Sequence, residues 1–210
     1  MSHPAVLLDL DRTLVDVQSF TDYDTAWRDV LAVLGQAVEE HGPETGWTAA
    51  TRACMALLGQ LPAGDQWYAV SETIAGHERA AVGLSRPMPG VAAFLEALSG
   101  VPVAVVTLLP QDVARQVLER HGLGVDAVVG RDPLVRPKPA GDGLRRALEL
   151  LGASSDGCHM VGDSAWDAAA AREAGVGFIG VHSPCSEFSA FPEAPVAASL
   201  AAALPHLRPS

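Results

Sequence analysis

The sequence is short of basic residues, and this shortage excludes two classes of partner. Its 210 residues contain 14 lysines and arginines against 25 aspartates and glutamates, a formal net charge of −11. Such a charge repels polyanions, so we expect the protein to bind neither nucleic acid nor an acidic membrane surface. A small anionic ligand would need a pocket that is locally positive.

Cysteines and long apolar runs are also scarce. Cys54, Cys158 and Cys185 are widely spaced and form no Cys-x-x-Cys pair, which argues against a disulfide framework and against a zinc site. No apolar run has the length of a membrane span, and the N-terminal segment lacks the basic start of a signal peptide. We therefore expect a cytoplasmic protein.

The apolar runs that are present are short and alternate with segments of helical spacing. Five of them have the character of buried parallel strands, at residues 5–10, 101–107, 127–129, 159–161 and 177–181. This alternation predicts an α/β fold with a doubly wound, mostly parallel, five-stranded sheet of the Rossmann-like type, which binds ligands at the carboxyl ends of its strands. The tail is expected to form a loop at 183–195 and a closing helix near 199–207.

Residues 16–86 interrupt this alternation, because they contain no strand-like run. Their periodicity predicts about three amphipathic helices, and the apolar stripe of the third includes His77, which we expect to pack in the core or the cap. We therefore divide the chain into an α/β core domain of residues 1–15 and 87–210 and an inserted all-helical cap of residues 16–86. The insert directly follows the first strand, so it can cover a site at the end of that strand.

Two carboxylates, Asp9 and Asp11, follow the first strand. They are two residues apart, so an extended chain places them on the same side. Two like charges this close are unfavourable unless a cation offsets them. Magnesium suits the position, because it prefers hard oxygen ligands and bridges to phosphate. The alternative is a solvated strand end, where acidic residues are also common.

A second pair of acids follows the strand at 159–161. Asp163 lies at the carboxyl end of that strand, and Asp167 comes one turn into the next helix, so both side chains can point toward one metal ion. A helix N-cap would also explain an acidic or hydroxyl residue here, and it is a sufficient explanation for Ser164.

The only lysine of the chain is Lys138, in a proline-rich stretch that leads into a predicted helix. A compact ammonium at this point can neutralise a phosphoryl oxygen. The alternative is an exposed lysine on a loop. Thr107 ends the strand at 101–107, and its hydroxyl can donate to a phosphate oxygen, although threonine is common in strands.

Together these segments resemble the four sequence motifs of haloacid dehalogenase superfamily hydrolases. The motifs are Asp9-x-Asp11-x-Thr13, Thr107 after an apolar strand, Lys138-Pro139, and Gly162-Asp163-Ser164-x-x-Asp167. Each motif alone is weak, but four in the family's order are specific. The insert is similar to the helical cap of many members, and the chain resembles the phosphoglycolate phosphatases in particular.

The resemblance implies a magnesium-dependent phosphatase that acts on a small phosphorylated metabolite, such as phosphoglycolate or a sugar phosphate. Asp9 matches the nucleophile that forms an aspartyl-phosphate, and Asp11 matches the general acid and base. Thr107 and Lys138 match the residues that bind the phosphate. The implied metal ligands are Asp9, the backbone carbonyl of Asp11, Asp163, and Asp167 either directly or as a support.

Two positions depart from the family pattern and are expected to face the substrate or the cap. Arg12 stands where many members have glycine, and Leu108 stands where many have asparagine. Two interpretations of Arg12 stay open: it binds a second anionic group of the substrate, or it is a solvated loop residue. One of the insert's four arginines could also contact an anionic group of the substrate, while most are expected to be surface charges; they are Arg28, Arg52, Arg79 and Arg86.

Three other functions are compatible with parts of this pattern. A phosphomutase of the β-phosphoglucomutase type would pass the phosphoryl group from Asp9 back to the substrate. A dehalogenase is disfavoured because Asp11 is present, and a non-catalytic binding protein is disfavoured because all the motif residues are intact. The protein is expected to act as a monomer or a homodimer.

Overall fold

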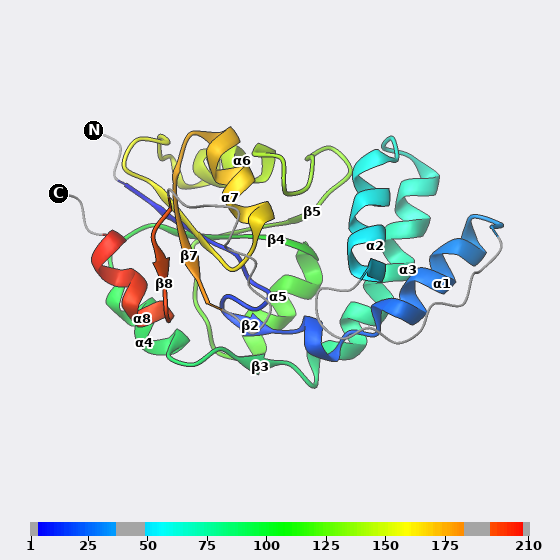
Figure 1. Ribbon diagram of the computed structural model, residues 1–210, viewed down its shortest axis with the longest axis horizontal. Helices are drawn as coiled ribbons and strands as arrows, with labels where there is room; N and C mark the ends of the chain where they lie inside the picture. The colour runs from blue at the N-terminus through cyan, green and yellow to red at the C-terminus, as the bar shows by residue number, and fades with distance from the viewer. Residues whose placement is uncertain (1–3, 37–48, 183–193, 208–210) are drawn as a thin grey trace.

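The computed structural model describes residues 4–36, 49–182 and 194–207 (Figure 1). The main sheet in these ranges has six strands, all parallel, in the order β5-β4-β1-β6-β7-β8. Their bounds are Val6–Leu8 (β1), Val103–Pro110 (β4), Ala127–Arg131 (β5), His159–Gly162 (β6), Gly177–Val181 (β7) and Val196–Ala197 (β8).

This order confirms the predicted class, because the chain runs outward from the central β1 in both directions. The sheet has one strand more than the five that were predicted. The additional strand, β8, is two residues long, which is too short for a recognisable apolar run. The predicted loop at 183–195 falls almost entirely outside the described residues.

Helices cover both faces of the sheet. Successive residues of a strand point to opposite faces, so each face carries apolar side chains that helices bury. Leu8 packs in a core cluster with Phe94 of α4, whereas Leu7 packs in a second cluster with Leu144 of α6. The helices of the first face are α4 (Val91–Ala97), α5 (Gln111–Arg120) and α8 (Leu200–Ala203), and those of the second are α6 (Asp142–Leu151) and α7 (Ala165–Ala174). The 3₁₀ helix Leu204–Leu207 follows α8, so the predicted closing helix is present.

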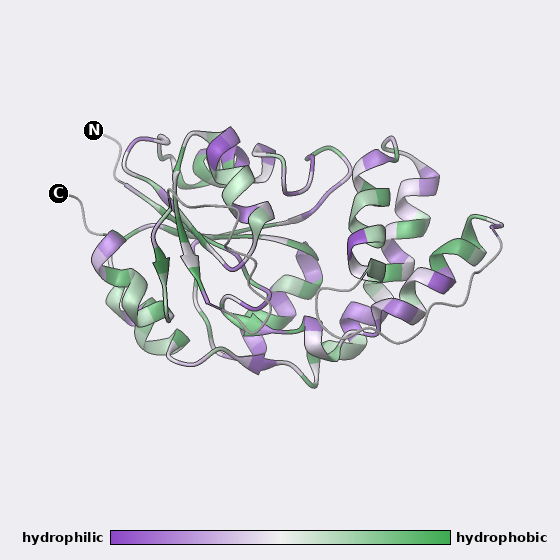
Figure 2. Ribbon diagram, viewed as in Figure 1, coloured by the Kyte–Doolittle hydropathy of each residue, from purple (hydrophilic) through white to green (hydrophobic). Residues whose placement is uncertain are grey.

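The described residues of the insert form three α-helices beside the sheet, at the right of Figure 1: α1 (Tyr23–Val33), α2 (Ala49–Gln60) and α3 (Asp65–Val82). Their apolar faces enclose a cluster of their own, which includes Trp67 and Ile74. Figure 2 shows hydrophilic and hydrophobic residues alternating along these helices, as amphipathic helices require. Within the described ranges no helix is long and apolar enough to cross a membrane.

Short elements lie at the two junctions between the insert and the sheet. The strands β2 (Val15–Asp16) and β3 (Arg86–Pro87) pair in an antiparallel manner, and a 3₁₀ helix at Gln18–Phe20 leads into α1. The two ends of the insert are therefore held side by side. The domain boundaries at residues 16 and 86 stay a prediction.

Gly130, near the end of β5, allows a close approach of two backbone segments. A Cβ atom at this position would lie 2.9 Å from the carbonyl oxygen of Leu109 and closer still to the backbone of Gln111. Backbone atoms cannot swing away as the end of a flexible side chain can. The close approach between the end of β5 and the β4–α5 junction therefore requires glycine at position 130.

We predict that Gly130→Ala lowers the free energy of unfolding by about 1–3 kcal/mol, because the added methyl group forces the two backbones apart. Urea denaturation followed by circular dichroism measures this change. Gly124→Ala is the matched control, since Gly124 is exposed and a Cβ there meets nothing within 4 Å. The control should change the free energy by less than about 0.5 kcal/mol. Equal stability of the two variants would contradict the prediction.

Candidate active site

The predicted site residues meet where β1, β4 and β6 end. Strand β1 is hydrogen-bonded to β4 on one side and to β6 on the other. Asp9 and Asp163 directly follow β1 and β6. Thr107 was predicted to end its strand, but β4 continues to Pro110, and Thr107 lies where its register with β5 shifts after Val106. The three residues lie toward the carboxyl ends of their strands, where ligands of parallel sheets bind. A cavity of about 140 Å³ lies at these ends.

Residues of both the core and the insert line this cavity. All eight predicted site residues are among them: Asp9, Asp11, Arg12, Thr107, Leu108, Lys138, Asp163 and Asp167. The insert contributes Tyr23 from α1 and Thr51, Arg52 and Met55 from α2. The two parts of the chain thus enclose one volume, with acidic and basic groups on the core side.

Lys138 is buried between two carboxylates. Its Nζ atom lies 2.6 Å from Asp9 Oδ1 and 2.6 Å from Asp167 Oδ1. Its side chain is 5% exposed, so the alternative of an exposed loop lysine is wrong. Burial acts to lower the pKa of Lys138, but the two carboxylates overcome it and raise the pKa above its ordinary value. The ammonium therefore keeps its charge inside the site.

The same influences act on the pKa of Asp9 in the opposite direction. Burial is the largest of them and raises its pKa, while the charge of Lys138 lowers it. The neighbouring carboxylates of Asp167 and Asp163 raise it further. Because Lys138 donates to Oδ1, the second oxygen of Asp9 is the one that can meet a ligand.

Asp167 is fixed at the start of α7 by a capping box. Its Oδ2 accepts from the backbone amide of Ser164 at 3.1 Å, and the Ser164 hydroxyl accepts from the amide of Asp167 at 3.2 Å. The N-cap interpretation of Ser164 is therefore confirmed. A Cβ atom at Gly162 would lie 2.6 Å from the Asp167 carboxyl group, so a glycine is needed there.

The Asp11 carboxylate is held by the chain that follows it. Its Oδ1 accepts from the backbone amides of Val17 at 2.9 Å and Gln18 at 3.0 Å. Burial raises the pKa of Asp11 to about 7, although these two amides act in the opposite direction. A carboxyl group with this pKa exchanges a proton near neutral pH, as a general acid and base must.

Three carboxylates of the site suit a divalent cation. Oxygens of Asp9, Asp163 and Asp167 lie within 4.8 Å of one another. Together with the ammonium of Lys138 they leave two negative charges, and hard oxygen ligands are those that Mg²⁺ prefers. Both oxygens of Asp167 are engaged already, by Lys138 and Ser164, so the geometry favours the supporting role for Asp167.

The remaining predicted residues form the rest of the core wall. The hydroxyl of Thr107 accepts from the amide of Leu109 at 3.2 Å, which leaves its O–H to donate to a ligand. Arg12 has a φ of 67°, in the left-handed region that favours glycine. It is only 7% exposed, so the interpretation as a solvated loop residue is wrong. Leu108 packs against the apolar cluster of the insert.

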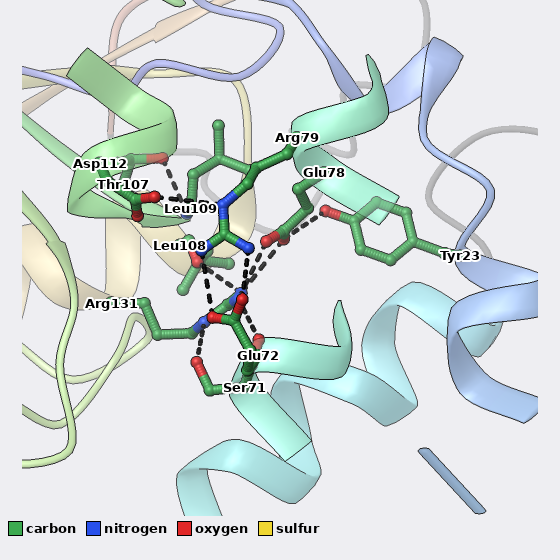
Figure 3. A network of polar contacts seen from close by, with 10 residues as sticks. All are labelled: Tyr23, Ser71, Glu72, Glu78, Arg79, Thr107, Leu108, Leu109, Asp112 and Arg131. Atoms are coloured by element: carbon green, nitrogen blue, oxygen red, sulfur yellow. Dashed lines mark hydrogen bonds and ion pairs between the residues drawn. The ribbon is translucent and has the colours of Figure 1, made fainter. Parts of the chain in front are cut away.

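A buried polar network beside the cavity was not foreseen from the sequence (Figure 3). Its centre is Arg131, the last residue of β5, which pairs with Glu78 of α3 at 2.9 Å. Arg131 also donates to the backbone carbonyl of Leu108 at 3.1 Å. The hydroxyl of Tyr23, a cavity residue, donates to Glu78 at 3.0 Å.

Two features of the sequence could have revealed this network. Arg131 lies two residues beyond a predicted strand, where functional side chains of parallel sheets occur. Glu78 lies four residues after the buried Ile74, so it is on the buried side of α3. The predicted stripe included His77 instead. That residue is partly exposed and contacts Asp29 of α1 at 2.8 Å, so it packs within the cap.

Two curated proteins resemble this chain over most of their length. The phosphoglycolate phosphatase of Rhodospirillum rubrum is 34% identical over 184 residues, which cover 82% of this chain and 76% of that protein. The plasmid phosphoglycolate phosphatase of Cupriavidus necator is 34% identical over 181 residues, which cover 82% of this chain and 78% of that protein.

Solved structures share the fold. A hydrolase from Pseudomonas syringae has a TM-score of 0.71 at 24% identity, with 98% of each chain covered. CbbY from Rhodobacter sphaeroides in complex with phosphate has a TM-score of 0.72 at 19% identity, with 97% of this chain and 96% of that chain covered.

Family membership rests on a match to the whole motif set. The model of a family of hydrolases described as haloacid dehalogenase-like matches residues 3–175, which contain every predicted motif. The curated relatives agree with it, and the predicted resemblance is therefore confirmed. This chain belongs to the haloacid dehalogenase-like hydrolases.

Proposed function

We propose that the protein is a magnesium-dependent phosphatase that hydrolyses a small phosphorylated metabolite through an aspartyl-phosphate on Asp9. The observation that carries the proposal is the 2.6 Å contact between Asp9 and Lys138 in a cavity that also contains Asp163. A nucleophile, a cation for the phosphoryl oxygens and a hard metal ligand thus share one small volume. The phosphatase names of the curated relatives support the same reaction class.

The reaction has two displacements at phosphorus. In the first, an oxygen of Asp9 attacks phosphorus, and the bond between phosphorus and the leaving oxygen breaks. Asp11 donates a proton to that oxygen, which departs as an alcohol. In the second, the ionised Asp11 takes a proton from water while the water oxygen attacks the aspartyl-phosphate. The bond between phosphorus and Asp9 breaks, which releases inorganic phosphate.

Fixed charges stabilise the transferring group. Lys138 and the hydroxyl of Thr107 bind phosphoryl oxygens, and Asp167 keeps the ammonium in place. A bound Mg²⁺ would neutralise part of the charge of the phosphoryl group. The proposed ligands of the ion are Asp9, the backbone carbonyl of Asp11, and Asp163.

The substrate is proposed to be small and to carry a second anionic group, as phosphoglycolate and some sugar phosphates do. The cavity of about 140 Å³ has room for a small leaving group. Arg12 and Arg52 both line it and can meet a carboxylate or a second phosphate. A phosphomutase would use the same aspartyl-phosphate but would need a bisphosphate primer. We further propose that the protein is cytoplasmic and acts as a monomer or a homodimer.

We predict that Asp9→Asn abolishes phosphate release from 2-phosphoglycolate, with a loss of at least about 10³-fold, because an amide is a poor nucleophile. A phosphate assay on a panel of small phosphomonoesters measures the rate. Asp156→Asn is the matched control, because Asp156 is an exposed acid outside the cavity. Full activity of Asp9→Asn would overturn the proposed mechanism.

Removal of divalent cations should abolish phosphate release by the wild type, because the paired carboxylates would then repel the substrate phosphate. The measurement adds a chelator to the same assay and restores activity by titration with Mg²⁺. Asp163→Asn should raise the Mg²⁺ concentration needed for half-maximal rate by about tenfold or more. Undiminished release in the chelator would contradict the role of the cation.

We predict a kinetic burst for Asp11→Asn with p-nitrophenyl phosphate. This leaving group departs without protonation, so the first displacement stays fast. Without a base, hydrolysis of the aspartyl-phosphate should slow by about 10²–10⁴-fold. Stopped-flow absorbance should therefore show about one equivalent of p-nitrophenol released before slow turnover. A steady state without a burst, at the rate of the wild type, would exclude Asp11 as the base.

A further inference from the structure

All the N–H groups of the Arg131 guanidinium are engaged (Figure 3). Nε donates to Ser71 Oγ at 3.0 Å, and Nη2 donates to the Ser71 carbonyl at 3.0 Å and to Glu78 Oε2 at 2.9 Å. Nη1 donates to Glu78 Oε1 and to the Leu108 carbonyl, both at 3.1 Å. A guanidinium presents its donors in a rigid planar fork, so these acceptors together define one position for it.

The network joins the sheet to the insert. Arg131 ends β5, whereas Ser71 and Glu78 both lie on α3. The side chains of Arg131 and Glu78 are 2% and 0% exposed, so water does not compete for these contacts. Two buried charges are tolerated only where their geometry is good. The pair therefore specifies one seating of α3 on the sheet.

The same network reaches both walls of the cavity. On the core side, Arg131 holds the carbonyl of Leu108, the residue directly after Thr107. On the side of the insert, Glu78 accepts the hydroxyl of Tyr23, which lines the cavity. Arg131 itself is not among the lining residues, so any effect on the substrate passes through these neighbours.

Another polar contact between α3 and the core lies at the surface. Arg79 pairs with Asp112 of α5 at 3.2 Å, and their side chains are 35% and 53% exposed. Water and salt screen such pairs, so they contribute little. Arg79 therefore provides a matched control for Arg131, because it is an arginine whose ion pair also joins α3 to the core, but at the surface.

We propose that Arg131 is a positioning residue that sets the wall formed by the insert against the phosphate-binding end of β4, and thereby determines which leaving groups the cavity accepts. The inference rests on the proposed phosphatase function for its kinetic consequence. The structural consequence, that this network seats α3 on the sheet, is independent of the proposed function.

The first experiment compares Arg131→Met with Arg79→Met. In Arg131→Met, the ratio of kcat/KM for 2-phosphoglycolate to kcat/KM for p-nitrophenyl phosphate should fall at least about tenfold, because the wall no longer fits the small leaving group. In Arg79→Met the ratio should stay within about threefold of the wild type. Equal ratios in the two variants would overturn the inference.

A second variant separates positioning from stability. Arg131→Met leaves Glu78 as a buried unpaired charge, which can unfold the protein, whereas Arg131→Met/Glu78→Met removes both charges together. The double variant should fold, as circular dichroism will show, and should still lose the discrimination between the two substrates. Recovery of the wild-type ratio in the double variant would reduce the network to a structural role and overturn the inference.

Hydrogen exchange keeps the structural consequence testable by itself. The amides of α3 should exchange at least about tenfold faster in the double variant than in Arg79→Met, because the helix has lost its defined seat. Unchanged exchange would overturn the inference. If the wild type released phosphate from neither substrate, the proposed function would fail, and the exchange result alone would decide on the role of Arg131.

Discussion

The site depends on one interaction, in which the ammonium of Lys138 lies between the carboxylates of Asp9 and Asp167. Buried carboxylates at one edge of a sheet repel one another, and each would retain its proton if nothing opposed this. The ammonium offsets the repulsion, so that β1 and α7 can bring their acids to the same point. A buried charge is stable only when it is paired, so the loop that carries Lys138 must fold over the end of the sheet.

Lys138 and Arg131 are two of the buried cations among the described residues of this acidic protein, and each is of the type that its surroundings require. Lys138 meets two carboxylates with a compact ammonium, whose donors are not confined to a plane. Arg131 meets a carboxylate, a hydroxyl and two carbonyls with a planar fork. The first cation holds the reacting groups together, and the second joins the insert to the core beside them. Neither residue could replace the other without loss of contacts.

The sequence predicted the class of the fold and the core side of the cavity, but not the contact between core and insert. Asp9, Thr107 and Asp163 follow or end apolar runs, and strand order alone then places them at one edge. Strand β8 was not predicted, because a segment of two residues is too short to show the periodicity of a strand. The pairing of Arg131 with Glu78 was not predicted either, because the two are 53 positions apart, and no local pattern records such a contact.

The chemistry of the Arg131–Glu78 contact gives the boundary a specific geometry, and it also allows that boundary to open, as the proposed exchange of substrate would require. An apolar interface of similar area would stabilise the closed position by the full hydrophobic free energy, because apolar surface is removed from water when the interface forms. An ion pair differs, because water solvates both charges as the boundary opens and thereby offsets the contacts that are lost. Its net free energy is smaller than that of such an apolar interface, while its geometry is specific. The network can therefore define the closed position of α3 on the sheet without making that position permanent.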